Sequence, residues 1–267
     1  MLGAAGCAQP SVPATFSVEP IAASSSLPVA PQLIIDLQKA GNAIDALARR
    51  RITVDDPVYK QRKTYEGPLL RDVIRLLVPD QTIPKDAQLV LVCLDGYRAS
   101  LTWAMAQGDA VLARRDVDAP SVWLALPTNG DATPSPFYLV WEPSPDAASR
   151  PWPYGVSGIE VWATDPLERA KPGEEASEAV RSGFALFANH CAKCHRLNGA
   201  GGALSTELNV PANVTEYWKP EALRAFIRQP SSVQAGARMP AFPGLAAGEI
   251  DQLMTYLEAM KRRKLTP

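Results

Sequence analysis

The chain has 267 residues, of which 46% are hydrophobic and 21% are charged, and its formal net charge at pH 7 is −1. This length suits two modest domains that each bury a core of their own, and the near-zero charge gives no electrostatic footprint for binding nucleic acid. No run of eighteen apolar residues occurs, so the sequence predicts no membrane-spanning helix.

Residues 1–31 are predicted to be the remnant of an export signal followed by a flexible tether. Small residues precede Cys7 in the sequence LGAAGC, which resembles the end of a bacterial lipoprotein signal, although Ala4 stands where leucine is usual. The resemblance implies a lipid on Cys7 and attachment to a membrane; the alternative is that Cys7 is incidental. The stretch rich in Pro, Ser and Ala that follows holds too few large apolar side chains to offset the cost of ordering.

Residues 32–164 alternate short apolar runs with turn signals, which predicts one α+β domain. The apolar spacing predicts a helix over Pro68–Val78. The run Gln88–Leu94 predicts a strand buried on both faces, and Asp95-Gly96 predicts a tight turn into a partner strand over Tyr97–Trp103. Three more strands are predicted, over Ser121–Leu126, Pro136–Trp141 and Gly158–Trp162. The basic run Arg49–Arg51 is expected on the solvated side of a helix.

The segments Thr64–Leu70, Leu89–Leu94 and Asp95–Tyr97 resemble the molybdopterin-binding domain of the sulfite oxidase superfamily, over roughly residues 54–162. The resemblance implies a sulfite-oxidase-like mixed β fold, in which a cysteine at a strand end supplies a thiolate to molybdenum. Cys93 falls at about that place. The alternative is a small buried core residue, because cysteine is among the residue types most often buried.

A molybdenum cofactor also needs several convergent basic groups to hold its phosphate. Near Cys93 only Arg98 is clearly offered, and no histidine precedes residue 190. The sequence therefore predicts a domain without molybdenum that serves as a docking or scaffold module. A fused molybdenum oxidoreductase remains the alternative.

Residues 165–175 are polar and contain Pro166, Pro172 and Gly173, which is typical of a linker. Residues 176–264 then show apolar positions at helical spacing, separated by loops rich in Gly and Pro. This pattern predicts a small all-α domain.

The sequence His190-Cys191-Ala192-Lys193-Cys194-His195 contains a Cys-x-x-Cys-His motif. In this motif two thiols add across the vinyl groups of one haem c, and the adjacent imidazole coordinates its iron, so Cys191, Cys194 and His195 are the candidate residues. A thioredoxin-like redox pair or half of a zinc site is the alternative. Zinc wants two more ligands, and a thioredoxin motif should follow a strand, whereas this one ends a predicted helix.

Met239 is predicted to be the second axial ligand of the iron by elimination among the histidines and methionines. His190 adjoins the attachment motif and cannot reach the opposite face of a haem, and Met254 continues an apolar helical stripe. Met239 stands between two predicted helices, in a loop whose prolines can fix a thioether. The alternative is a methionine that only covers the surface.

With these residues, the stretch from Ala176 to Lys264 resembles class I cytochrome c, apart from the missing Gly-Pro-x-Leu sequence after the motif. The resemblance implies that Gly183 and Phe184 of the first helix meet Tyr256 and Leu257 of the last. His/Met ligation favours the reduced iron and a high potential. We therefore expect a non-enzymatic carrier of single electrons between redox proteins, in the periplasm or elsewhere outside the cytoplasm.

Overall fold

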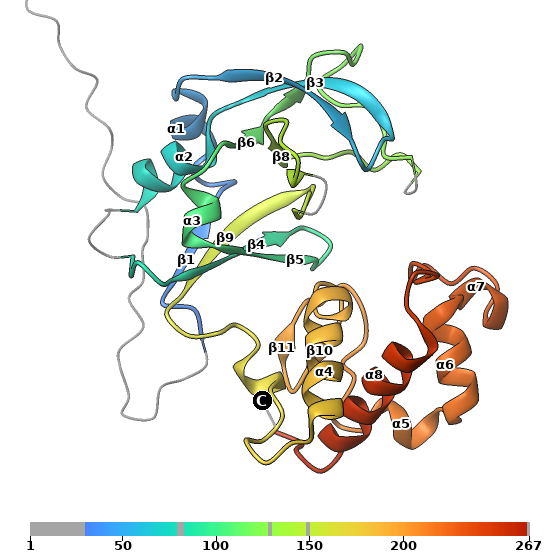
Figure 1. The fold of residues 1–267 in the computed structure, drawn as a ribbon. Helices are drawn as coiled ribbons and strands as arrows, with labels where there is room; N and C mark the ends of the chain where they lie inside the picture. The colour runs from blue at the N-terminus through green and yellow to red at the C-terminus, as the bar shows by residue number, and fades with distance from the viewer. Residues whose placement is uncertain (1–29, 79–82, 128–129, 148–149, 266–267) are drawn as a thin grey trace, which may run out of the picture.

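The computed structural model describes residues 30–78, 83–127, 130–147 and 150–265. Cys7 and almost all of the predicted tether lie outside these residues. The described chain forms two lobes, and Figure 1 shows them one above the other. The N-terminal lobe runs from β1 (Leu33–Asp36) to β9 (Val156–Trp162), and the C-terminal lobe from α4 (Glu178–Leu186) to α8 (Ala247–Met260). Their buried apolar residues form separate clusters.

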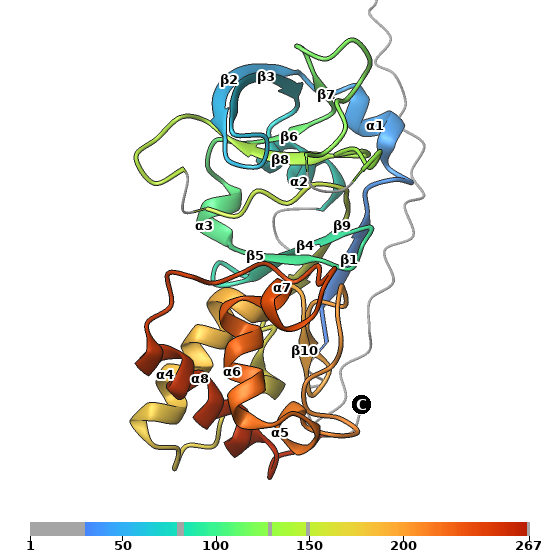
Figure 2. The ribbon, with the colours of Figure 1, turned by 90° about the vertical axis from the view of Figure 1, so that its right-hand side faces the viewer.

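An antiparallel sheet forms the part of the N-terminal lobe nearest the C-terminal lobe (Figure 2). Its strand order is β1, β9, β4 (Gln88–Cys93) and β5 (Arg98–Thr102). The predicted strands β4, β5 and β9 and the predicted turn between β4 and β5 are confirmed. One face of this sheet packs on α2 (Leu70–Leu77), the helix predicted over Pro68–Val78.

The remaining strands of this lobe lie on its far side, in both views (Figures 1 and 2). They pair as β2 with β3 and β7, and as β6 with β8, and β8 confirms the strand predicted over Pro136–Trp141. Short helices α1 and α3 complete the lobe, which is thus a mixture of helices and strands. The bounds of these elements are α1 Gly41–Asp45, β2 Arg50–Asp56, β3 Gln61–Gly67, α3 Trp103–Ala106, β6 Ala110–Ala113, β7 Arg115–Asp116 and β8 Tyr138–Trp141.

Two predictions for the N-terminal lobe are wrong. Ser121–Leu126 is not a strand: the segment lies between Pro120 and Pro127, which cannot donate ladder hydrogen bonds, and its Ser121 hydroxyl bonds locally to the carbonyl of Trp123. The run Arg49–Arg51 does not lie on a helix, because its last two residues open β2. There the arginines pair with acidic residues, Arg51 with Glu66 of β3 at 2.9 Å and Arg50 with Glu142, which follows β8, at 2.6 Å.

The C-terminal lobe is built around the crossing of α4 and α8 (Figure 1). Its other helical segments are η3 (Glu168–Ala170), η4 (Phe187–Cys191), α5 (Val214–Tyr217), α6 (Pro220–Arg228) and α7 (Pro230–Val233). It is not entirely helical, since the chain after the Cys-x-x-Cys-His motif forms a two-residue antiparallel pair, β10 (Arg196–Leu197) with β11 (Ala200–Gly201). No helix among the described residues is long and apolar enough to cross a membrane.

The predicted contact between the first and last helices of this lobe is confirmed. A Cβ placed on Gly183 would lie 2.1 Å from the carbonyl oxygen of Gln252, so only glycine permits this approach. The ring of Phe184 lies 5.7 Å from that of Tyr256, whose hydroxyl donates a 2.7 Å hydrogen bond to the carbonyl of Ala170. Tyr256 thus also fixes η3, the segment that leads into this lobe.

Candidate functional site

The Cys-x-x-Cys-His segment follows α4 without a break. A single π-helical turn, η4, delivers Cys191, and the amides of Cys194 and His195 then both donate to its carbonyl, at 3.0 and 2.9 Å. This hydrogen-bonded turn keeps Cys191 and Cys194 close together, and neither forms a disulfide. Burial raises the pKa of the Cys191 thiol to about 12 and also raises that of Cys194.

The imidazole of His195 is oriented by the chain that follows it. Its Nδ1 lies 2.9 Å from the carbonyl oxygen of Thr206. A carbonyl can only accept a hydrogen bond, so Nδ1 carries the proton and the lone pair of Nε2 is free to bind a metal. This is the arrangement in which metal-ligating histidines are usually held.

His195, Cys191 and Met239 line one cavity of about 450 Å³. Met239 comes from the loop between α7 and α8, is half-buried and packs on the core of the lobe. The rest of the lining is mostly apolar, supplied by Phe187, Leu208, Val214, Tyr217, Trp218, Leu223, Phe226, Ile227, Leu253 and Leu257. The structure thus brings together an imidazole nitrogen, a thioether and a thiol around an apolar space. These groups fit a haem, which needs apolar walls, two axial donors and an attachment thiol.

Cys194 lines a second cavity of about 600 Å³, which it shares with His195 and Met239. This space lies on the side of the motif toward the N-terminal lobe, since Asp95 and Tyr154 also line it. The four residues predicted to hold haem are therefore distributed around two adjoining cavities that have His195 and Met239 in common.

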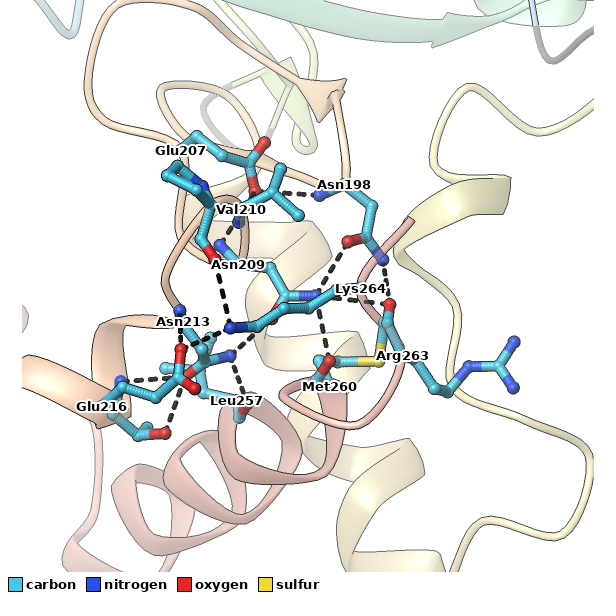
Figure 3. A network of polar contacts seen from close by, with 12 residues as sticks. Asn198, Glu207, Asn209, Val210, Asn213, Glu216, Leu257, Met260, Arg263 and Lys264 are labelled. Atoms are coloured by element: carbon cyan, nitrogen blue, oxygen red, sulfur yellow. Dashed lines mark hydrogen bonds and ion pairs between the residues drawn. The ribbon is translucent and has the colours of Figure 1, made fainter. Parts of the chain in front are cut away.

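Three buried asparagines that the sequence analysis did not single out fix the loop beside His195 (Figure 3). The side-chain amides of Asn198, Asn209 and Asn213 donate to backbone carbonyls at the end of α8 and just beyond it, those of Arg263, Met260 and Leu257, at 2.8 to 2.9 Å. Carbonyls in the last turn of a helix lack partners further along it, so Asn209 and Asn213 help to cap α8, while Asn198 holds the segment that follows the helix. The signal in the sequence was the pattern Asn213-x-x-Glu216, which forms a capping box here.

Glu207 joins this network to the histidine. Its carboxylate accepts hydrogen bonds from the backbone amides of Asn198, Gly199 and Asn209 at 2.9 to 3.0 Å. The neighbouring residue is Thr206, whose carbonyl accepts from His195. The orientation of the imidazole therefore depends on a loop pinned by one carboxylate and three amides.

The other candidate residues do not line the two cavities that His195 and Met239 share. Cys93 is buried at the end of β4, and burial strongly raises its pKa. Arg98, the basic neighbour expected for a molybdenum cofactor, forms an ion pair with Glu160. His190 is exposed and meets the ring of Phe242 edge-on. Over the part of the chain that the structure describes, no group of three or more His, Cys, Asp or Glu side chains could hold a metal ion.

Comparison with known proteins bears on this same region. Residues 178–257 match the family model described as cytochrome C oxidase, cbb3-type, subunit III. The C-terminal lobe contains a cytochrome c domain. A cytochrome c domain implies haem c and indicates a protein that carries electrons.

A curated relative is cytochrome c oxidase subunit 2 of Alkalihalophilus pseudofirmus, which is 34% identical over 113 residues. The aligned region covers 40% of this chain and 30% of the relative, so the chain spans less than a third of that protein's length.

Proposed function

We propose that this protein is a mono-haem c-type cytochrome that carries single electrons between redox proteins outside the cytoplasm. Cys191 and Cys194 hold the haem through thioethers, and His195 and Met239 are its axial ligands. The observation that supports this most directly is that the imidazole and the thioether line the same apolar cavity, with Cys191 at its wall. The matching family and the similar protein are both described as subunits of cytochrome c oxidases, which supports a place in electron transfer.

The residues around the cavity suit one-electron transfer. Bound haem iron supplies the redox change itself. The apolar walls disfavour extra charge and so favour the ferrous state, while the hydrogen bond from His195 to Thr206 keeps the imidazole in a single orientation in both states. Little needs to move when the charge changes.

We propose that residues 32–164 form a sulfite-oxidase-like domain that acts as a docking or scaffold module without molybdenum, joined by the linker 165–175 to a haem domain over 176–264. The ion pair of Arg98 with Glu160 supports this, because it engages the basic side chain that the sequence offers near Cys93. The proposal includes location in the periplasm or attachment to a membrane through a lipid on Cys7. The alternative function, a fused molybdenum oxidoreductase, requires a metal at Cys93.

The test is to produce the full chain in a host that matures c-type cytochromes and to measure iron, molybdenum and covalent haem. We expect one iron per chain, no molybdenum, and colour that stays on the denatured polypeptide after acid-acetone extraction. Cys93→Ala should leave the haem spectrum intact, with a packing loss of about 1 kcal/mol. Extractable colour would refute covalent attachment. Stoichiometric molybdenum, lost in Cys93→Ala together with an oxidase activity, would replace the proposal with the alternative.

A further inference from the structure

The turn between β4 and β5 of the N-terminal lobe is fastened to the Cys-x-x-Cys-His segment of the C-terminal lobe. The backbone amide of Arg98 donates to the carbonyl of Lys193 at 3.0 Å, and the amide of Ala203 donates to the carbonyl of Gly96 at 2.8 Å. Lys193 stands between the two motif cysteines. The turn is therefore bonded to the haem-attachment segment at Lys193 and to the chain that follows it at Ala203. Figures 1 and 2 show this sheet lying beside that lobe.

Gly96 makes this close approach possible. Its φ is +88°, a conformation that favours glycine, and a Cβ at this position would lie 2.8 Å from the carbonyl carbon of Ala203. The residue type at position 96 is thus restricted to glycine for two reasons, the backbone conformation and the close approach of the C-terminal lobe. The glycine therefore fits the close contact between this turn and Ala203 of the C-terminal lobe.

Two side chains of the N-terminal lobe face the cavity that Cys194, His195 and Met239 also line. Asp95 belongs to the turn between β4 and β5, and its carboxylate accepts a 2.9 Å hydrogen bond from the amide of Tyr97. Tyr154 is half-buried, and its ring lies 6.4 Å from that of the fully buried Tyr138 in an edge-on arrangement. Both side chains are therefore held by their own lobe while they face the other.

We propose that the N-terminal lobe is a wall of the haem site, in which Asp95 and Tyr154 border the haem edge beside Cys194. This inference rests on the proposed function. The negative charge of Asp95 stabilises the more positive ferric state and so lowers the haem potential, although Arg238 brings a positive charge to the same cavity. The ring of Tyr154 keeps water and small reagents from this edge. Both are positioning and tuning residues rather than ligands.

The test compares the haem potentials of two matched variants of the full haem-loaded chain at low salt. Asp95→Asn should raise the midpoint potential, because it removes a negative charge near the iron. Asp55→Asn is the control: it makes the same charge change in β2, on the far side of the N-terminal lobe, where the Asp55 side chain is 85% exposed. Its potential should equal that of the parent chain.

Tyr154 is tested by two substitutions. Tyr154→Phe keeps the ring and should leave the potential unchanged. Tyr154→Ala opens the wall to water, which stabilises the charged ferric state, so it should lower the potential and speed reduction by ascorbate several-fold. A merely structural tyrosine would change the unfolding temperature without changing either readout.

The contact between this turn and the C-terminal lobe is tested by amide hydrogen exchange. Gly96→Ala should speed exchange at Ala203 and Arg98, whereas Gly130→Ala should not. Gly130 also has a positive φ, of +59°, but a Cβ there meets no atom within 4 Å. Equal potentials in Asp95→Asn and Asp55→Asn, together with unchanged exchange in Gly96→Ala, would overturn the inference. A chain that fails the covalent haem stain would instead overturn the proposed function, so the two failures are distinguishable.

Discussion

Gly183 of α4 lies so close to Tyr256 of α8 that a Cβ on the glycine would stand 2.6 Å from the Cβ of the tyrosine. Gly183→Ala should therefore push the two helices apart, and we expect a loss of about 1–3 kcal/mol in the free energy of unfolding. Gly248→Ala is the matched control within α8, because a Cβ there meets no atom within 4 Å, and it should be neutral or stabilise by up to about 1 kcal/mol. Denaturant unfolding monitored by circular dichroism measures both. Equal effects of the two substitutions would contradict the prediction.

Met239→Ala should remove the thioether from the cavity that it shares with His195. We expect the haem potential to fall by a substantial part of the ~0.8 V range that axial ligands span, and carbon monoxide to bind the ferrous form. Absorption spectra and potentiometry measure both effects. Met105→Ala, in α3 of the N-terminal lobe, should change neither. An unaltered spectrum and potential in Met239→Ala would remove this residue from the ligand set.

Asn209→Ala should destabilise the C-terminal lobe from within the network of Figure 3. The amide of Asn209 donates to the side chain of Asn198 at 2.8 Å and to the carbonyl of Met260 at 2.9 Å, and its oxygen accepts from Asn213 at 2.7 Å. Truncation leaves these buried groups without partners, at about 1–3 kcal/mol for each group that water does not reach. We expect a total loss of about 2–4 kcal/mol in the free energy of unfolding. A loss below about 1 kcal/mol would mean that water replaces the amide.

Asp45 should make the stability of the N-terminal lobe sensitive to acid. Arg114 donates to both of its carboxylate oxygens, at 2.9 and 2.7 Å, and these hydrogen bonds lower the pKa of Asp45. A folded-state pKa below the unfolded value of about 3.9 gives stabilisation that is present above pH 4 and is lost as the pH falls through the folded-state pKa. Asp45→Asn should therefore cost less than about 1 kcal/mol at pH 6, because the pair is partly exposed, and this cost should vanish near pH 2. Urea unfolding across this pH range measures the difference. A cost that does not change with pH would show that the ion pair is not its source.

The sequence predicted β4, β8 and β9 of the N-terminal lobe because these strands are mostly apolar. Every residue of β8 is buried, and β4 and β9 are nearly so. It did not predict β2 and β3, whose outer faces carry charged residues and whose inner faces show only alternate buried positions, such as Ile52 and Val54. The alternation of buried and exposed positions in β2 covers only a few residues and follows directly on a run of arginines, so it gives a weak strand signal.

The candidate haem residues could be proposed from the sequence because the attachment chemistry is local: two cysteines and a histidine occupy five consecutive positions. The approach of Gly96 to Ala203 could not be predicted, since it depends on how two separately folded cores meet. The Asn198 network was hidden for a similar reason. Its partners are backbone carbonyls at and just beyond the end of α8, which any sequence would supply.

The place of β9 in its sheet has a consequence for the order of folding. β9 is the last strand of the N-terminal lobe along the chain, yet it lies between β1 and β4, and it pairs Val161 with both Leu33 and Leu89. The sheet is thus closed by contacts between residues far apart in sequence, which slow folding. During synthesis from the N-terminus, β1 has no partner strand in this sheet until residues 156–162 have been made. The N-terminal lobe therefore completes its sheet only after β9 has been made, shortly before synthesis of the C-terminal lobe begins.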